Sequence, residues 1–402
     1  MSEATAATTT APGGEEVLER ARKLQELLAR NAAETDRARR IPDENLAALT
    51  DAGLFRLTAP RRVGGFELPL RTFLEVSAVL GEACGSTSWV VTLVNVCSWI
   101  TGLFGDRAQQ DVWSSGPDTR VCGVLAPSAE ARRVEGGLRL SGSWGYASGC
   151  LHARWAVLGI PVVDANGEQV DQGVALIPMD ELRIEDTWFV AGMRGTGSNT
   201  LVAEDVFVPD HRILSVPAAI DNEYATEHRD EVLYRSSFVP VLALVLAGPQ
   251  VGMARGAVRQ AVEKAPRRQI AYTVFERQTD STAFQMQVSD AAMLADSAAL
   301  HVWRAAADIE GAAERGEKLD YQIRARVRAD TGWAIRCARE AIDTVISANG
   351  ASSFAEASAL QRLWRDANTA GRHAVVLPAV NQEVYGKALL GIPYEENITP
   401  LI

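Results

Sequence analysis

The stretch AGMRGTGSNTLVAEDVFVPDHRIL, residues 191–214, ends the part of this chain that has the character of strands. Glycines and hydroxyl residues crowd its first half, and mainly apolar residues fill its second half, up to the Val208-Pro209 pair. This pattern is typical of a turn that leads into a half-buried strand. From about residue 121 to residue 213, further β-branched runs alternate with turn sequences such as Glu135-Gly136-Gly137. We therefore predict a β domain in the middle of the chain.

The segments on both sides of this region show helical spacing. Val17, Leu24 and Leu28 recur at helical intervals before it, and stripes such as Phe284–Val288 and Ile335–Ile342 follow it. A chain of 402 residues is long enough for two or three structural units. The following ranges are predicted: a disordered tail over 1–14, an N-terminal helical domain over 15–118, a central β-sandwich or barrel domain over 119–225 and a C-terminal four-helix bundle over 226–402.

The composition disfavours several classes of partner. A formal net charge of −11 argues against a nucleic-acid surface of clustered Lys and Arg. Apolar runs such as 239–246 fall short of the roughly 20 residues that a membrane helix needs, and residues 1–16 lack the pattern of a signal peptide. Five scattered cysteines show no CxxC spacing, and no His-Glu-x-x-His motif occurs. We expect a cytoplasmic protein with no metal, nucleic-acid or membrane partner.

Three motifs in order along the chain resemble the acyl-CoA dehydrogenase fold. They are IPDENLAALTDAGLFRLTAPRRVGGFELP at 41–69, the stretch at 191–214, and NGASSFAEASALQRLWRDANTAG at 349–371. The resemblance implies an acyl-CoA dehydrogenase-like arrangement of a helical domain, a β domain and a helical bundle. It does not by itself imply dehydrogenase activity, because one fold carries several activities.

The residues that differ from the dehydrogenases point to another branch of this fold. The Glu-Gly-Thr turn that often carries the dehydrogenases' base does not follow Arg365-Asp366; His373 stands eight residues after Arg365. Together with SGSWGYASGCLHARW at 141–155, this resembles the oxygenase components of two-component flavin monooxygenases. The resemblance implies FMNH2 or FADH2 from a separate, transiently bound NAD(P)H:flavin reductase, O2 as cosubstrate and a flavin hydroperoxide as oxidant. It also implies a homotetramer.

Two residues are the candidates for catalysis. A reactive flavin needs a dry pocket and a hydrogen bond near its N5 atom, and Ser148, at a Gly-rich strand end, is our candidate for that contact. His is the side chain whose pKa suits deprotonation of a phenol near neutral pH, and His373 is our candidate base. With an amine substrate, His373 would instead keep the amine neutral.

Other residues are expected to bind the flavin or the substrate. Backbone N–H groups and hydroxyls of the 194–198 turn suit an anionic or polar flavin edge, and Trp188 suits stacking on its ring. The regions equivalent to the dehydrogenases' adenine clamp, YTVFERQTDSTAFQMQ and ISANGASSF, lack its motifs, which favours a borrowed reduced flavin. Trp89 and His152 are expected near the substrate. The full cofactor set is Trp144, Tyr146, Ser148, Trp188, Arg194, Gly195, Thr196, Gly197 and Ser198.

The leading hypothesis is a monooxygenase that hydroxylates an aromatic or polyketide-type phenol, as in secondary metabolism and antibiotic biosynthesis. An amino-sugar N-oxygenase of the same fold is the first alternative. An FAD-dependent acyl-CoA dehydrogenase and a non-catalytic flavin-binding scaffold are further alternatives.

Overall fold

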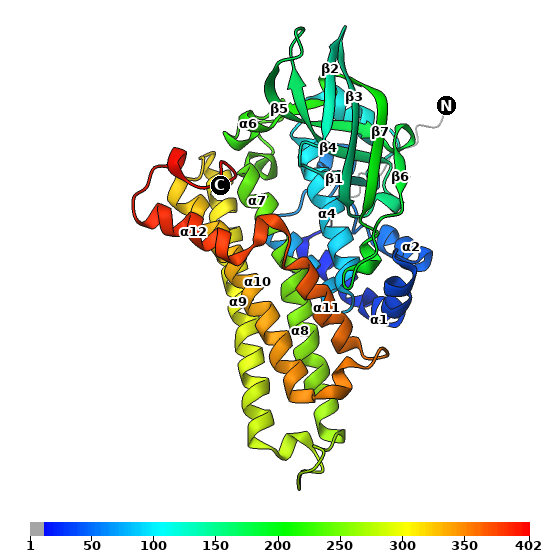
Figure 1. Ribbon diagram of the computed structural model, residues 1–402, viewed down its shortest axis with the longest axis vertical. Helices are drawn as coiled ribbons and strands as arrows, with labels where there is room; N and C mark the ends of the chain where they lie inside the picture. Colours follow the sequence, from blue (N-terminus) through cyan, green and yellow to red (C-terminus); the bar gives the residue numbers. More distant parts are fainter. Residues whose placement is uncertain (1–11) are drawn as a thin grey trace, which may run out of the picture.

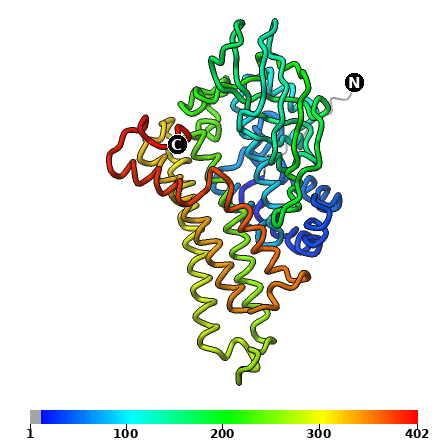
Figure 2. The backbone as a smooth tube through the Cα atoms, viewed as in Figure 1, coloured from blue at the N-terminus to red at the C-terminus, as the bar shows by residue number. Residues whose placement is uncertain are grey.

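A computed structural model describes residues 12–402 of the chain. The predicted order of a helical domain, a β domain and a helical bundle is confirmed. Figures 1 and 2 show that the β domain and the tip of the bundle lie at opposite ends of the long axis, with the N-terminal helices beside the junction. Residues 1–11 of the expected tail lie outside the described part, and Gly14, which we placed in that tail, already begins the first helix.

Helix α4 is buried along nearly its whole length, because it packs against α3 of the same domain and also against parts of the two other domains. The helices of this domain are α1 (Gly14–Ala38), α2 (Asp43–Asp51), α3 (Leu70–Gly81), α4 (Gly85–Gly102) and α5 (Asp106–Trp113). The quoted segment at 41–69 supplies α2 and the loop that leads to α3.

The β domain consists of two packed four-stranded sheets, ordered β1-β4-β5-β8 and β2-β3-β7-β6. It is therefore a sandwich, with Trp144, Leu158, Ile177 and Leu201 buried between the sheets. The turn at Glu135-Gly136 joins β2 to β3 as the sequence predicted. The strands are β1 (Val121–Val124), β2 (Ala129–Val134), β3 (Gly137–Ala147), β4 (Trp155–Val163), β5 (Gln169–Pro178), β6 (Arg183–Glu185), β7 (Asn199–Pro209) and β8 (Ile213–Ser215).

The C-terminal domain is built on four helices that pack together, α8 to α11. A short helix, α6 (Val216–Ile220), follows β8 and packs mainly against β5 and β8 of the sandwich. The helices of the C-terminal domain are α7 (Phe238–Leu244), α8 (Ala247–Lys264), α9 (Thr282–Arg315), α10 (Tyr321–Asn349), α11 (Ala359–Ala370) and α12 (Pro378–Leu389). Gly248, Gly252 and Gly256 lie every four residues on α8 and face α3. A Cβ atom on Gly252 would lie 2.1 Å from the carbonyl oxygen of Ala78, so only glycine lets the two backbones approach so closely.

The stretch Phe238–Arg267, which spans α7 and α8, is longer than the apolar run at 239–246 that it contains. By length and composition it would pass as a membrane span, but 83% of its most apolar window is buried inside the protein. Its packing against α3, α9, α10 and α11 is that of the core helix of a globular domain.

Candidate active site

Three buried hydroxyl groups form a continuous chain that ends on a backbone carbonyl. The Oγ atoms of Ser148 and Ser198 lie 2.7 Å apart, Ser198 Oγ lies 2.6 Å from Thr196 Oγ1, and Thr196 Oγ1 donates to the Met193 carbonyl at 2.8 Å. Strand register explains the meeting: Ala147 at the end of β3 pairs with Asn199 at the start of β7, so the residues next to them become neighbours. The structure thus brings together three of the predicted flavin contacts.

Trp89 connects this hydroxyl chain to His373. From α4, the indole Nε1 of Trp89 donates a hydrogen bond of 3.2 Å to Ser148 Oγ. The centroids of the Trp89 and His373 rings lie 6.2 Å apart, with a tilt of 57°. The two residues predicted to be catalytic are therefore separated only by a side chain that was predicted to contact substrate.

His373 caps the short 3-10 turn that follows α11, and its Nδ1 accepts a long hydrogen bond, 3.4 Å, from the Val375 amide. The residue is exposed to solvent in the single chain. Partial loss of hydration near the surrounding protein nevertheless lowers the pKa of His373 below its ordinary value. The imidazole is therefore neutral near pH 7.

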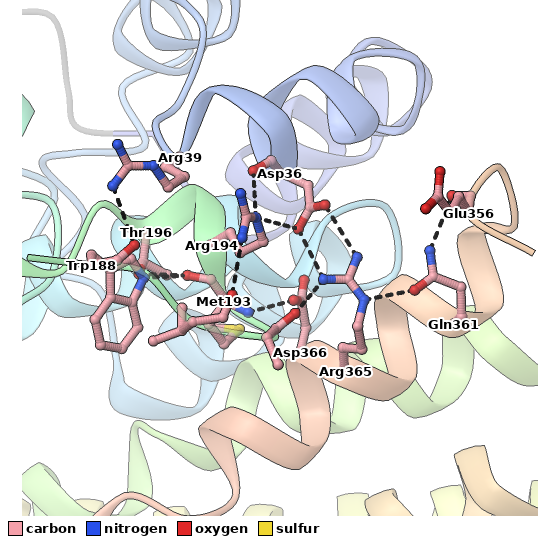
Figure 3. A network of polar contacts seen from close by, with 12 residues as sticks. Asp36, Arg39, Trp188, Met193, Arg194, Thr196, Glu356, Gln361, Arg365 and Asp366 are labelled. Carbon is pink, nitrogen blue, oxygen red and sulfur yellow. Dashed lines mark hydrogen bonds and ion pairs between the residues drawn. The ribbon is translucent and has the colours of Figure 1, made fainter. Parts of the chain in front are cut away.

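Helix α11 holds the 188–199 loop through contacts that the sequence analysis did not assign to the site (Figure 3). Asp366 accepts a hydrogen bond of 2.5 Å from the Met193 amide, and burial raises the pKa of this carboxyl to about 6. Arg365 pairs with Asp36 of α1 at 3.1 Å. Helix α11 therefore ties the 188–199 loop to the segment that carries His373. The Arg-Asp pair was visible in the sequence, but its partners were not.

Three residues of the 194–198 turn, which was predicted to bind the flavin, have a structural role in the loop itself. Arg194 donates to the carbonyl oxygens of Asp36 and Val190, which fastens the loop to α1. A Cβ atom on Gly195 would lie 2.3 Å from the Thr35 side chain. Gly197 has a φ of +54°, in the left-handed region that favours glycine. These glycines are explained by packing and by turn geometry.

Aromatic side chains lie next to the hydroxyl chain. The rings of Tyr146 and Trp188 meet edge to face at 5.7 Å, and the Trp188 indole donates to the Met193 carbonyl at 2.9 Å. Tyr146 is 75% exposed and Phe189 is 68% exposed. Large exposed aromatic side chains beside buried hydroxyls suit a planar, partly polar ligand. The chemistry of these groups fits an isoalloxazine ring, with Ser148 as its polar contact.

Two predicted contacts lie elsewhere. Trp144 is buried in the core of the sandwich, where its indole donates to the Gly159 carbonyl at 2.9 Å, because alternate residues of β3 point into that core. His152 is also buried, and its loss of hydration together with the charges of Arg40 and Arg120 lowers its pKa to about 4. The structure does not bring either side chain to the Ser148–Trp89–His373 cluster.

The surface also carries recesses away from this cluster. One of about 430 Å³ is lined by residues such as Tyr224, Arg229 and Lys318, and a second of about 360 Å³ by residues such as Val262 and Phe284. Neither contains a residue of the predicted site. Within residues 12–402, no group of three or more His, Cys, Asp or Glu side chains could hold a metal ion.

Comparisons with known proteins agree with this architecture. Residues 14–116 match the acyl-CoA dehydrogenase N-terminal domain family, and residues 244–378 match the acyl-CoA dehydrogenase C-terminal domain family. The oxygenase subunit HsaA of a flavin-dependent monooxygenase from Rhodococcus jostii is 36% identical over 372 residues, which cover 92% of this chain and 97% of that protein.

Two further relatives extend this comparison. An FADH2-dependent resorcinol hydroxylase oxygenase component from a Rhizobium species is 32% identical, with 91% of this chain and 92% of that protein covered. The structure of XiaF from a Streptomyces species, in complex with FADH2 and glycerol, superimposes with a TM-score of 0.89. It is 38% identical, and the match covers 96% of this chain and 97% of XiaF.

Fold and site thus define an acyl-CoA dehydrogenase-like flavoenzyme without the dehydrogenases' Glu-Gly-Thr turn. At 36% identity over almost its whole length, the chain belongs to the family of oxygenase components of flavin-dependent monooxygenases.

Proposed function

We propose that this enzyme hydroxylates an aromatic phenol with O2 and with FMNH2 or FADH2 that a separate NAD(P)H:flavin reductase delivers. The observation that carries the proposal is the position of Trp89, which bonds Ser148 through its indole N–H and lies against His373. The site therefore has a hydroxyl side at Ser148 and an imidazole side at His373, and the indole of Trp89 lies between them. The resorcinol-hydroxylating relative supports a phenol rather than an amino sugar.

The hydroxyl side would hold the flavin. Ser148 would contact the ring, and Trp188 and Tyr146 would flank it. Reduced flavin, when bound, supplies the electrons that let O2 deliver one oxygen atom to the substrate. The chain's own contribution is to hold the ring beside Trp89 and to limit the access of water. Ser148, Thr196 and Ser198 are at most 5% exposed, which suits the second task.

The imidazole side would hold the phenol oxygen. A neutral imidazole carries one proton, and while Val375 donates to Nδ1 that proton lies on Nε2, which then donates a hydrogen bond to the substrate. Once the long Val375 contact breaks, Nδ1 can carry the proton and Nε2 can accept the phenol's proton. Removal of that proton makes the ring more nucleophilic toward the incoming oxygen.

Substitution of His373 tests this assignment. We expect His373→Ala to slow hydroxylation by about 10² to 10⁴-fold, the usual contribution of a general base, while it leaves the affinity for reduced flavin unchanged. His373→Gln keeps a hydrogen-bond donor but cannot take up a proton, so it should be as slow as His373→Ala if the proton transfer matters. The measurement is product and hydrogen peroxide formed in a single turnover of enzyme mixed with reduced FMN, resorcinol as a test phenol, and O2.

His301→Ala provides a matched control, because this histidine lies on α9 and bonds the Ser297 carbonyl outside the site. It should hydroxylate at the parent rate. A His373→Ala enzyme that also keeps the parent rate would show that His373 is structural.

A further inference from the structure

The hydroxyl chain described above has a fixed direction. Three oxygen–oxygen separations of 2.6–2.8 Å follow one another, from Ser148 to Ser198, from Ser198 to Thr196 and from Thr196 to the Met193 carbonyl. Each separation this short needs a hydrogen atom between the two oxygens. Each hydroxyl carries one hydrogen, and a carbonyl oxygen carries none. Three hydrogens must therefore fill three gaps, and none remains.

Only one arrangement satisfies this count. Thr196 must donate to the Met193 carbonyl, so Ser198 must donate to Thr196, and Ser148 must donate to Ser198. At the other end, the Trp89 indole is a donor only, so Ser148 Oγ accepts from it at 3.2 Å. The chain runs from Trp89 to Met193 in one direction.

This count leaves Ser148 with one unused hydrogen-bonding position, which is an acceptor position on its oxygen. A hydroxyl oxygen can accept two hydrogen bonds, and Trp89 uses one of these positions. Toward a ligand, Ser148 can therefore accept a hydrogen bond but cannot donate one. All three hydroxyls are buried, so water does not readily replace a missing partner.

We infer that Ser198 and Thr196 are positioning residues: through the directed chain Trp89–Ser148–Ser198–Thr196–Met193 they hold Ser148 as an acceptor, and this sets the preference of the site for reduced over oxidised flavin. The inference rests on the proposed function, in which Ser148 contacts the flavin at N5. Reduced flavin carries a hydrogen on N5 and can donate to Ser148. Oxidised flavin has only a lone pair at N5, which would face the lone pair of Ser148 Oγ.

Ser148 is the flavin contact, whereas Ser198 and Thr196 act on it without needing to touch the flavin. Thr196 is the decisive position, because loss of its hydroxyl leaves two hydroxyl hydrogens for the single gap between Ser148 and Ser198. One hydrogen is then spare, and Ser148 can turn its O–H toward the ligand. The Met193 carbonyl keeps hydrogen bonds from the Trp188 indole at 2.9 Å and from the Thr196 amide at 3.2 Å.

Anaerobic titrations with oxidised FMN and with chemically reduced FMN, followed by protein fluorescence, test the inference through the ratio of the two dissociation constants. We expect the parent to bind reduced FMN at least tenfold more tightly than oxidised FMN. Thr196→Val should lower this ratio about three- to tenfold, the effect of one net hydrogen bond, chiefly by tighter binding of oxidised FMN. Thr196→Ser keeps three hydrogens for three gaps and should keep the parent ratio.

A second variant and a flavin analogue test the same inference independently. Ser198→Ala also frees the Ser148 hydrogen and should lower the ratio in the same direction, so the result does not depend on the folding of one variant. Reduced 5-deaza-FMN, which has carbon in place of N5, should bind the parent about as weakly as oxidised FMN.

The inference is overturned if Thr196→Val and Ser198→Ala, folded by circular dichroism, both keep the parent ratio, or if the parent does not distinguish the two forms of FMN. Either result would leave the proposed function standing, provided that the parent still hydroxylates a phenol with reduced FMN and O2. A parent that binds reduced flavin in no measurable amount would overturn both.

Discussion

His152 illustrates how a buried residue outside the reacting cluster can control stability. Burial and the neighbouring charges of Arg40 and Arg120 lower its pKa from the ordinary value near 6.5 to about 4. Between these two values the unfolded chain takes up a proton at this position and the folded chain does not, so the free energy of unfolding falls as the pH falls from 6.5 toward 4. At pH 5 this residue alone should cost about 2 kcal/mol relative to pH 8.

Urea denaturation of the parent and of His152→Gln at pH 8 and pH 5 measures this effect. Because glutamine does not titrate, the variant should lose about 2 kcal/mol less than the parent between the two pH values, whatever its stability at pH 8. Equal losses in the two proteins would show that His152 titrates alike in both states.

Helix α11 joins the two sides of the proposed site. Its Asp366 accepts the Met193 amide hydrogen, and a Cβ atom on Gly192 would lie 2.1 Å from the Arg365 carbonyl. Asp366→Ala leaves a buried amide without a partner, which should destabilise the protein by about 1–3 kcal/mol. It should also weaken binding of reduced FMN several-fold, because Met193 in turn orients Thr196 and Trp188.

Asp366→Asn is the matched variant, since its side-chain oxygen can still accept from Met193. It should retain most of the stability and most of the affinity for reduced FMN, as measured by urea denaturation and anaerobic titration. If the alanine and asparagine variants behave alike, the Met193 contact does not hold the loop.

The whole molecule presents an apolar stripe that a single chain leaves exposed. Met286, Met293 and Leu300 follow one another at seven-residue intervals along α9 and are 63%, 66% and 67% exposed. A long helix with such a stripe is typical of an interface between helices of neighbouring subunits. We expect a homotetramer of 43.3-kDa chains that covers this stripe.

Light scattering during gel filtration measures the assembly. Replacement of Met286 and Met293 by lysine should give a smaller species, because buried unpaired charges are costly. Val170→Lys changes a residue that is 63% exposed on β5 in the sandwich, and should leave the assembly unchanged. A parent that is monomeric while fully active would contradict the expectation.

The fold class and the order of the domains could be predicted from the sequence alone. Helical spacing around Leu24 and Ile335, and the alternation of strands and turns between them, are local patterns that record which side chains must be buried. The segments at 141–155 and 191–214, together with His373, placed Ser148, Thr196, Ser198 and His373 in one hypothesis, and the structure brings Ser148 and His373 to the two sides of Trp89.

The positions and partners of the candidate residues depend on the tertiary structure. Trp144 and Tyr146 are two residues apart in β3, yet the first lies in the sandwich core, whereas the second is exposed within the strand's irregularity between Trp144 and Ala147. Asp366 became part of the site because it meets Met193, which is 173 positions away in the chain. The direction of the hydroxyl chain likewise depends on distances between residues from separate elements. Contacts between distant segments arise from packing, and no local pattern in the sequence encodes their geometry.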